Sequence, residues 1–161
     1  MNYEISFEQV SKSFGSHTVL RDVEFSITPG RVHALLGRNG AGKSTLFSIF
    51  LGLLAADSGT IRVAGAPWSR EVLDHVGASV NGPAFYGHLS AAANLRVHTR
   101  LLGLPESEIE RVLAIVGLNG AGKKKAKSFS TGMKARLALG QALLGDPEIL
   151  VLDEPQNGLD P

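Results

Sequence analysis

Apolar side chains occupy every second position over residues 3–7 and again over residues 23–27. A period of two is typical of β-strands that bury one face. Turn-forming residues follow these stretches at Phe14-Gly15-Ser16 and at Pro29-Gly30. The pattern therefore predicts short antiparallel strands before residue 30.

A strand, a glycine-rich turn and a helix are predicted next. Residues 31–36 are a strand candidate, residues 37–43 carry the glycines, and residues 44–54 are apolar enough for a buried helix. Residues 60–63 are a further short strand. A strand, loop and helix in this order are typical of a phosphate-binding site.

Helical patterns dominate after about residue 83, and helices are predicted over residues 89–102, 106–116 and 131–144. The second is amphipathic, and Ser107 with Glu110 matches a capping box at its start. Four apolar residues, 149–152, then end at two carboxylates, as expected for a central strand of a parallel sheet.

These elements predict an α/β fold in a single domain. Its core, with a mainly parallel sheet and an N-terminal antiparallel β-subdomain, would comprise residues 1–80 and 145–161. A helical lobe would be inserted over about residues 83–145. We find neither a long-period repeat nor a low-complexity linker that would divide the chain further.

Composition excludes several classes of function. The 161 residues include no cysteine, which rules out disulfides and thiolate metal sites. A net charge of +1 is too small for a chain that coats a polyanion. The apolar stretch at residues 46–56 is too short to span a bilayer, and the first residues lack the pattern of a signal peptide. A cytoplasmic location, with at most a peripheral membrane role, is expected.

Residues 37–44 match the phosphate-loop motif G-x-x-x-x-G-K-[ST]. In such a loop the glycines let successive backbone N–H groups face the β-phosphate. Lys43 would bridge the β- and γ-phosphates of a nucleotide, and the Ser44 hydroxyl would ligate Mg²⁺. The motif therefore predicts a nucleoside triphosphate site.

A second run, residues 117–124, repeats most of this motif but has Lys124 in place of the hydroxyl. It follows an amphipathic helix, so we expect a helix cap and a loop there instead of a second nucleotide site. The neighbouring lysines are expected to form a solvated basic face, and no nucleic-acid partner is expected; they are Lys123, Lys124, Lys125 and Lys127.

Asp153 and Glu154 end the apolar run and supply the carboxylates that phosphoryl transfer needs. Such catalysis consists mainly of positioning and charge stabilisation around the phosphate. Asp153 would hold Mg²⁺, and Glu154 would be the general base for the attacking water.

The whole chain resembles an ABC transporter nucleotide-binding domain, a P-loop NTPase fold. Three segments carry the likeness in order and spacing: residues 37–45, residues 129–136, and Asp153-Glu154-Pro155 followed by Asn157-Gly158-Leu159-Asp160. Around residues 82–86 and 129–133 the chain is most similar to ATPase subunits of bacterial multidrug and antibiotic exporters.

The resemblance implies a role for each matching position. Phe14 would stack on adenine, the alternative being a core phenylalanine at a strand end. Asn81 stands where the family usually has a glutamine near the metal, the alternative being a structural turn. The implied ATP-binding residues are Phe14, Gly37, Arg38, Asn39, Gly40, Ala41, Gly42, Lys43, Ser44, Thr45 and Asn81.

In this family two domains enclose ATP between them, so the resemblance also implies contacts to ATP on the opposite subunit. Ser130, Gly132 and Asp160 would make them. Thr131 and Met133 depart from the usual signature, Leu-Ser-Gly-Gly-Gln. Without the resemblance, the same segment is the start of a basic, apolar helix.

The implied function is that of an ATP-binding subunit that hydrolyses ATP to drive export through a separate membrane permease. The family's switch histidine follows the position of Asp160, whereas all five histidines here precede Asp153. We therefore expect a domain truncated at its C-terminal end. The alternatives are a non-hydrolysing regulatory module and a soluble ABC ATPase of translation or repair; a small-molecule kinase is disfavoured.

Overall fold

The computed structural model describes residues 3–80, 82 and 84–155. The chain divides into two units between His75 and Val76. The division into a core and a helical lobe at residues 80–83 and 145 remains a prediction.

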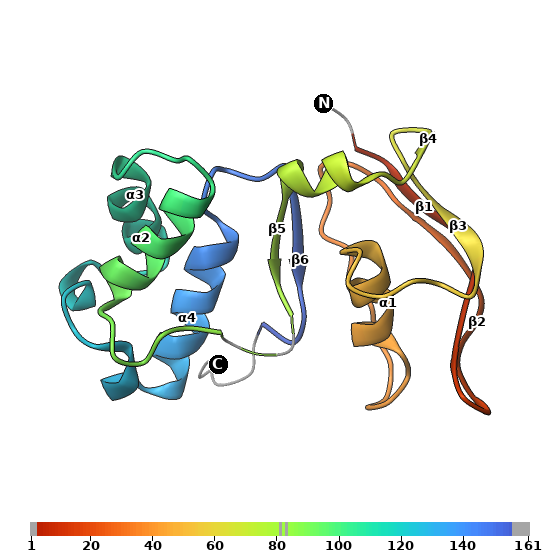
Figure 1. Ribbon diagram of the computed structural model, residues 1–161, viewed down its shortest axis with the longest axis horizontal. Helices are drawn as coiled ribbons and strands as arrows, with labels where there is room; N and C mark the ends of the chain where they lie inside the picture. The colour runs from red at the N-terminus through yellow and green to blue at the C-terminus, as the bar shows by residue number, and fades with distance from the viewer. Residues whose placement is uncertain (1–2, 81, 83, 156–161) are drawn as a thin grey trace. The chain divides into compact units, whose positions relative to one another are not determined.

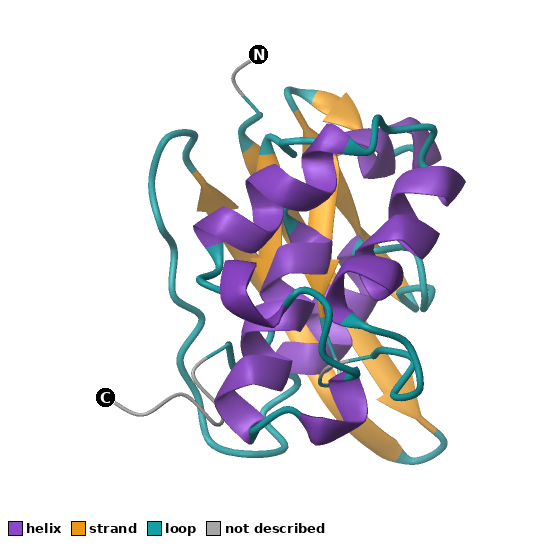
Figure 2. Cartoon of the chain, turned by 90° about the vertical axis from the view of Figure 1, so that its left-hand side faces the viewer, coloured by secondary structure: helices purple, strands orange, loops and turns teal. Residues whose placement is uncertain are grey.

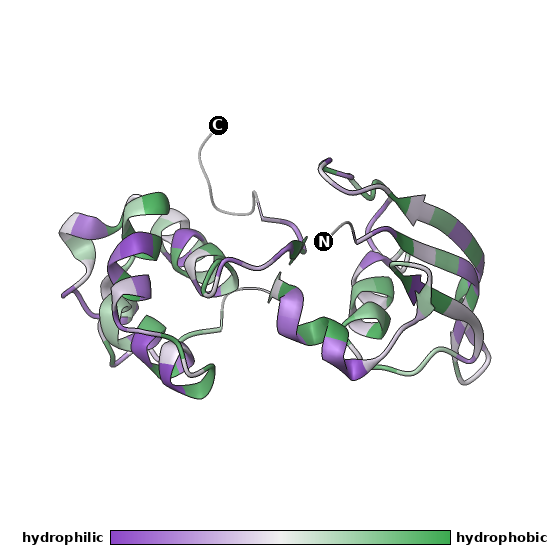
Figure 3. Ribbon diagram, turned by 90° about the horizontal axis from the view of Figure 1, so that it is seen from above, coloured by the Kyte–Doolittle hydropathy of each residue, from purple (hydrophilic) through white to green (hydrophobic). Residues whose placement is uncertain are grey.

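The first unit contains an antiparallel sheet with the strand order β2-β1-β3-β4. Its strands are β1 (Ile5–Phe14), β2 (His17–Ile27), β3 (Ser58–Val63) and β4 (Ala66–Pro67). Phe7 lies opposite Phe25, and their rings stack at a centroid distance of 4.5 Å. Hydrophobic and hydrophilic bands alternate along these strands in Figure 3. The predicted antiparallel hairpin is confirmed.

Helix α1 (Lys43–Phe50), labelled in Figure 1, buries the side chains of Leu46, Ile49 and Phe50. The helix is shorter than the predicted 44–54. The chain leaves it at Gly52, whose left-handed φ of 67° places the backbone against the Trp68 ring. A Cβ at this position would lie 2.9 Å from the ring, so the turn requires glycine.

The strand predicted over residues 31–36 is wrong in this structure. The segment has no strand geometry, and Val32 and Leu36 are 100% and 88% exposed. A strand needs a hydrogen-bonding neighbour, and among the described residues no strand pairs with this segment. The sequence pattern of residues 31–36 indicates a local preference for extended backbone. It does not supply the neighbouring strand with which these residues would have to pair.

The second unit starts with a parallel strand pair, β5 (Val76–Ser79) and β6 (Ile149–Leu152), in which Val76 lies opposite Ile149. β6 has the predicted bounds and parallel pairing. At Gly77 the end of the last helix approaches β5 closely, because a Cβ there would overlap the Ala142 carbonyl oxygen.

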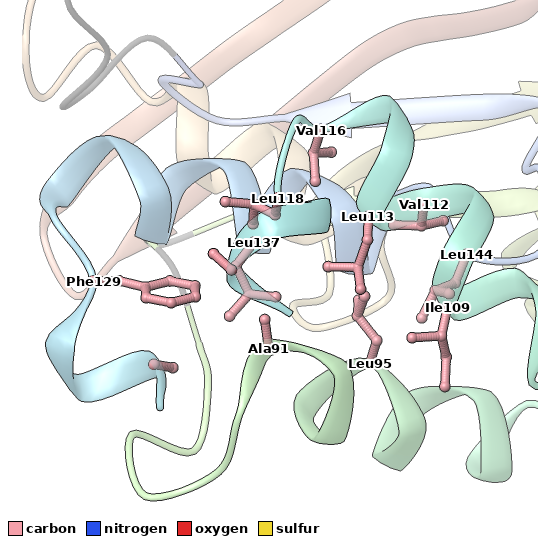
Figure 4. Close-up of a cluster of buried hydrophobic side chains, with 12 residues drawn as sticks. Ala91, Leu95, Ile109, Val112, Leu113, Val116, Leu118, Phe129, Leu137 and Leu144 are labelled. Atoms are coloured by element: carbon pink, nitrogen blue, oxygen red, sulfur yellow. The ribbon is translucent and has the colours of Figure 1, made fainter. Parts of the chain in front are cut away.

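Three α-helices among the described residues of this unit lie close together in Figure 2. They are α2 (Ala91–Leu101), α3 (Ser107–Ile115) and α4 (Thr131–Ala142). Figure 4 shows their apolar side chains meeting in one cluster. Its buried members are Ala91, Leu95, Ile109, Val112, Leu113, Val116, Leu118, Ala121, Ala126, Phe129, Leu137 and Leu144. All three predicted helices are present, each slightly shorter than expected.

The predicted capping box at Ser107 and Glu110 is wrong. Ser107 already lies within α3, and the residue before it, Glu106, has helical backbone angles and makes no side-chain cap. The first turn begins at Pro105, whose carbonyl accepts from the Glu108 N–H. Proline is favoured in a first helical turn, and it moves the start of the helix upstream of the serine.

An ion pair on α3 fastens this helix to the segment that follows α4. Arg111 donates to both carboxylate oxygens of Glu108 at 2.7 Å and to the Leu143 carbonyl at 2.8 Å. Glu108 also accepts from the Gly145 N–H at 2.9 Å. The hydrogen bond from Arg111 is the main reason that the pKa of Glu108 lies below its ordinary value.

Replacing Glu108 by glutamine will lower the free energy of unfolding at pH 7 by about 1–2 kcal/mol, because charge-assisted hydrogen bonds are lost. A lowered carboxylate pKa contributes stability above the ordinary value of 4.5, and this contribution is lost as the pH falls through the lowered pKa. Urea unfolding should therefore show a difference between the two proteins that is full above pH 4.5 and shrinks as the pH falls below that value.

Glu106→Gln is the matched control, since this exposed carboxylate forms an ion pair with Arg96. An exposed pair of this kind contributes less than about 1 kcal/mol. Equal losses in the two variants would contradict a special role for Glu108.

Candidate phosphate and base site

The loop between residues 37 and 43 has the backbone that a phosphate loop requires. Gly40 and Gly42 have left-handed φ angles of 82° and 88°, and the Ala41 N–H donates to the Arg38 carbonyl at 3.0 Å. α1 begins directly afterwards, and no side chain caps its first N–H groups. These amides can therefore serve an anion, toward which the helix dipole adds attraction.

Lys43 lies back across its own loop. Its Nζ donates to the carbonyl oxygens of Gly37 at 2.9 Å and Arg38 at 3.2 Å. The ammonium group is thus held beside the loop by neutral acceptors, which a phosphate could replace with a charge-assisted bond. Ser44 and Thr45 follow on the first turn of α1, where Ser44 is exposed.

The phosphate loop and Phe14 both lie next to strand β2. A Cβ at Gly42 would lie 2.6 Å from the Leu20 side chain and 3.1 Å from the Val19 side chain, so the loop packs directly on β2. Phe14 lies opposite His17 on the same strand. The three positions from His17 to Leu20 span about 10 Å of strand. The structure therefore brings a phosphate loop and an aromatic ring together within one unit.

Phe14 is 51% exposed, which contradicts the alternative of a core phenylalanine. An exposed ring at a hairpin tip presents a π-face to solvent. The structure thus leaves the ring accessible to a stacking partner.

The two carboxylates lie at the end of β6 in the second unit. The Asp153 N–H donates to the Ser79 carbonyl at 2.9 Å, which continues the pairing with β5. Glu154 is exposed and has a left-handed φ of 49°. Such a conformation costs a non-glycine residue about 1 kcal/mol or more and often marks a functional position. The joining of these carboxylates with the phosphate loop into one site remains a prediction.

The signature segment lies at the start of α4. Ser130 is the N-cap, and its hydroxyl accepts from the Met133 N–H at 3.2 Å. Phe129 is buried in the helical core, which fixes the chain just before the cap. Gly132 lies in the first helical turn, where it adds no side chain between the helix N-terminus and an approaching ligand. Asn81 and Asp160 lie outside the described residues.

The repeated glycine run is a helix end, as predicted. Gly117 has a left-handed φ of 66° directly after α3, and the Leu118 N–H donates back to the Leu113 carbonyl at 2.8 Å. Leu118 and Ala121 then enter the hydrophobic core. Because these side chains are buried in the core, this loop cannot fold around a phosphate.

Within the part of the chain that the structure describes, no group of three or more carboxylate or histidine side chains is arranged around a metal position. No described helix is long and apolar enough to cross a membrane. Sequence reasoning also missed Lys12, which lies over the Phe14 ring, and Asp57, which pairs with Lys12. Neither residue belongs to a motif.

Comparison with known proteins identifies the family. Residues 20–157 match the ABC transporter family. Over 157 residues the chain is 44% identical to the lantibiotic transport ATP-binding protein SrtF of Streptococcus pyogenes. This match covers 98% of this chain and 69% of SrtF. Over 165 residues it is 37% identical to the bacitracin transport ATP-binding protein BcrA of Enterococcus faecalis, covering 100% of this chain and 54% of that protein.

Among solved structures, cbiO1 from Clostridium perfringens, part of the ABC transporter complex cbiONQ, matches with a TM-score of 0.85 and 29% sequence identity. That match covers 99% of this chain and 68% of cbiO1. The predicted fold class is thereby confirmed. The family match, the two relatives and the fold lead to one conclusion: the chain belongs to the ABC transporter family, as its ATP-binding component.

Proposed function

We propose that this chain binds ATP with Mg²⁺ and powers export through a separate membrane permease. The observation that carries the proposal is the phosphate loop, with its left-handed Gly40 and Gly42, the uncapped N–H groups of α1 and Lys43 lying across the loop. The proposed binding residues are Phe14, Gly37, Arg38, Asn39, Gly40, Ala41, Gly42, Lys43, Ser44, Thr45 and Asn81.

The chemistry of Ser44 and Asp153 fits Mg²⁺. A hydroxyl and a carboxylate are hard oxygen ligands, and Mg²⁺ usually takes one or two protein ligands together with water and phosphate oxygens. When bound, the ion would neutralise charge on the phosphate oxygens. Glu154 would accept a proton from the attacking water, and its exposed carboxylate at the end of β6 suits that role.

The partners we propose are a second ATP-binding domain and an integral membrane permease. Ser130 and Gly132, at the exposed start of α4, and Asp160 would contact the ATP held by the second domain. The named relatives serve lantibiotic and bacitracin transport. By analogy the chain would act in the cytoplasm, at the inner face of the cell membrane.

Calorimetric titration of the chain with ATP and Mg²⁺, combined with an assay of phosphate release, tests this proposal. We expect saturable binding of ATP and slow phosphate release. Binding without release would favour the alternative of a non-hydrolysing regulatory module. Absence of binding would contradict the proposal, and co-purification with ribosomes or DNA instead of a permease would favour the soluble ABC ATPase.

A further inference from the structure

A charged side chain that no sequence motif includes lies over the Phe14 ring. The Lys12 ammonium lies over the Phe14 ring, 5.7 Å from its centroid. The same ammonium donates to the Asp57 carboxylate at 2.6 Å, and the other carboxylate oxygen accepts from the Ser13 N–H at 2.7 Å. A cation within about 6 Å of a ring face is attracted to it. Lys12 thus connects the ring to a fixed carboxylate.

Asp57 is itself hydrogen-bonded to strand β1. Its backbone N–H donates to the Ser11 carbonyl at 2.9 Å, so this one residue contacts three successive residues of β1 ahead of Phe14. The hydrogen bond from Lys12 and then that from Ser13 lower the pKa of Asp57. The carboxylate is therefore charged at neutral pH.

The regular strand pairing is interrupted at this place. The register between β1 and β2 shifts on both sides of Lys12, and the register between β1 and β3 shifts between Glu8 and Ser11. Irregular pairing locally disrupts the hydrogen bonds between neighbouring strands. The side-chain bonds between Asp57 and Lys12 hold the chain at this irregular stretch, directly before Phe14 pairs with His17.

We propose that Lys12 and Asp57 are positioning residues that hold the Phe14 ring ready for the base of the nucleotide. The inference rests on the proposed function, in which Phe14 stacks on adenine. Lys12 lies over the ring and Phe14 is still 51% exposed, so the base would use the remaining surface. A ring ordered in advance loses less conformational freedom on binding, which strengthens affinity.

A purely structural ion pair makes a different prediction from a positioning pair. Positioning of Phe14 affects only ligands that carry a base, whereas general loosening of the sheet would disturb the adjoining phosphate loop as well. Inorganic tripolyphosphate, which has no base, is therefore the discriminating probe beside ATP.

The test measures ATP and tripolyphosphate affinities by calorimetry, with Mg²⁺ present, for Asp57→Asn, Lys12→Met, Phe14→Ala and the double variant Phe14→Ala/Asp57→Asn. Asp57→Asn and Lys12→Met should each weaken ATP binding roughly twofold to fivefold, the range of an exposed cation–π contact. Tripolyphosphate affinity should stay unchanged. Because Asp57 acts through the ring, the double variant should bind ATP no more weakly than Phe14→Ala alone.

Glu8→Gln is the matched control, because it removes an exposed ion pair that β1 makes with Arg62 of β3. It should leave both affinities unchanged. If Asp57→Asn and Phe14→Ala weaken ATP binding additively, or if Asp57→Asn weakens tripolyphosphate equally, the positioning role is overturned while ATP binding stands. If Phe14→Ala leaves ATP affinity intact, both the stacking role of Phe14 and this inference fail.

Discussion

Replacing Lys43 by alanine will abolish measurable ATP binding, with an affinity loss of at least about a hundredfold. The Lys43 ammonium is hydrogen-bonded to the phosphate loop through the carbonyls of Gly37 and Arg38. A charge-assisted bond to phosphate contributes more than a neutral one, and a hundredfold corresponds to about 2.7 kcal/mol. Calorimetric titration with ATP and Mg²⁺ measures the effect directly.

The chain offers a control that is nearly identical in sequence. Lys123 follows Gly120-Ala121-Gly122, just as Lys43 follows Gly40-Ala41-Gly42, but its loop ends a helix and packs into the core. Lys123→Ala should leave ATP affinity unchanged. Similar losses in both variants would indicate a general electrostatic effect and would contradict a specific phosphate site at Lys43.

The phosphate loop was predictable because its chemistry is local. Phosphate binding requires left-handed glycines, and the motif spacing fixes where Gly40 and Gly42 stand. The strand at 149–152 was predictable for a related reason, since an apolar run with two terminal carboxylates has few other uses. Local signals of this kind need no knowledge of the rest of the chain.

Features that depend on distant partners were not predictable in the same way. Residues 31–36 have a strand pattern, but only a neighbouring strand could make them one. β5 was missed because Val76-Gly77-Ala78-Ser79 has no apolar run; its pairing with β6 and the close approach of Ala142 define it. Asp57 lies 45 residues from Lys12, so no local motif could reveal their bond.

The predicted capping box is absent from the start of α3 because two local sequence signals compete there. Ser107 and Glu110 have the spacing of a cap, but Pro105 already starts a helical turn two residues earlier. A cap residue must have extended backbone angles, which the serine cannot adopt inside that turn. Ser130, by contrast, has an extended backbone and is a true N-cap.

Replacing Glu154 by glutamine will preserve ATP binding and lower the rate of phosphate release by about a hundredfold to ten-thousandfold, in any preparation in which the unmodified protein hydrolyses ATP. Glutamine has nearly the same shape, so the left-handed turn after β6 can persist. It cannot accept a proton from water, and loss of a general base costs about two to four powers of ten in rate. Single-turnover phosphate release, measured beside ATP affinity, separates the chemical step from binding.

Glu148→Gln is the control that tests whether the loss of phosphate release is specific to the position of Glu154. Glu148 is an exposed carboxylate directly before β6, at the opposite end of the strand from Glu154, and its replacement changes the charge by the same amount. It should leave both turnover and affinity unchanged. Unaltered turnover in Glu154→Gln would refute the base assignment. Lost ATP binding in that variant would instead place Glu154 in nucleotide binding, since an exposed carboxylate that only accepts a proton from water has no part in holding the phosphates.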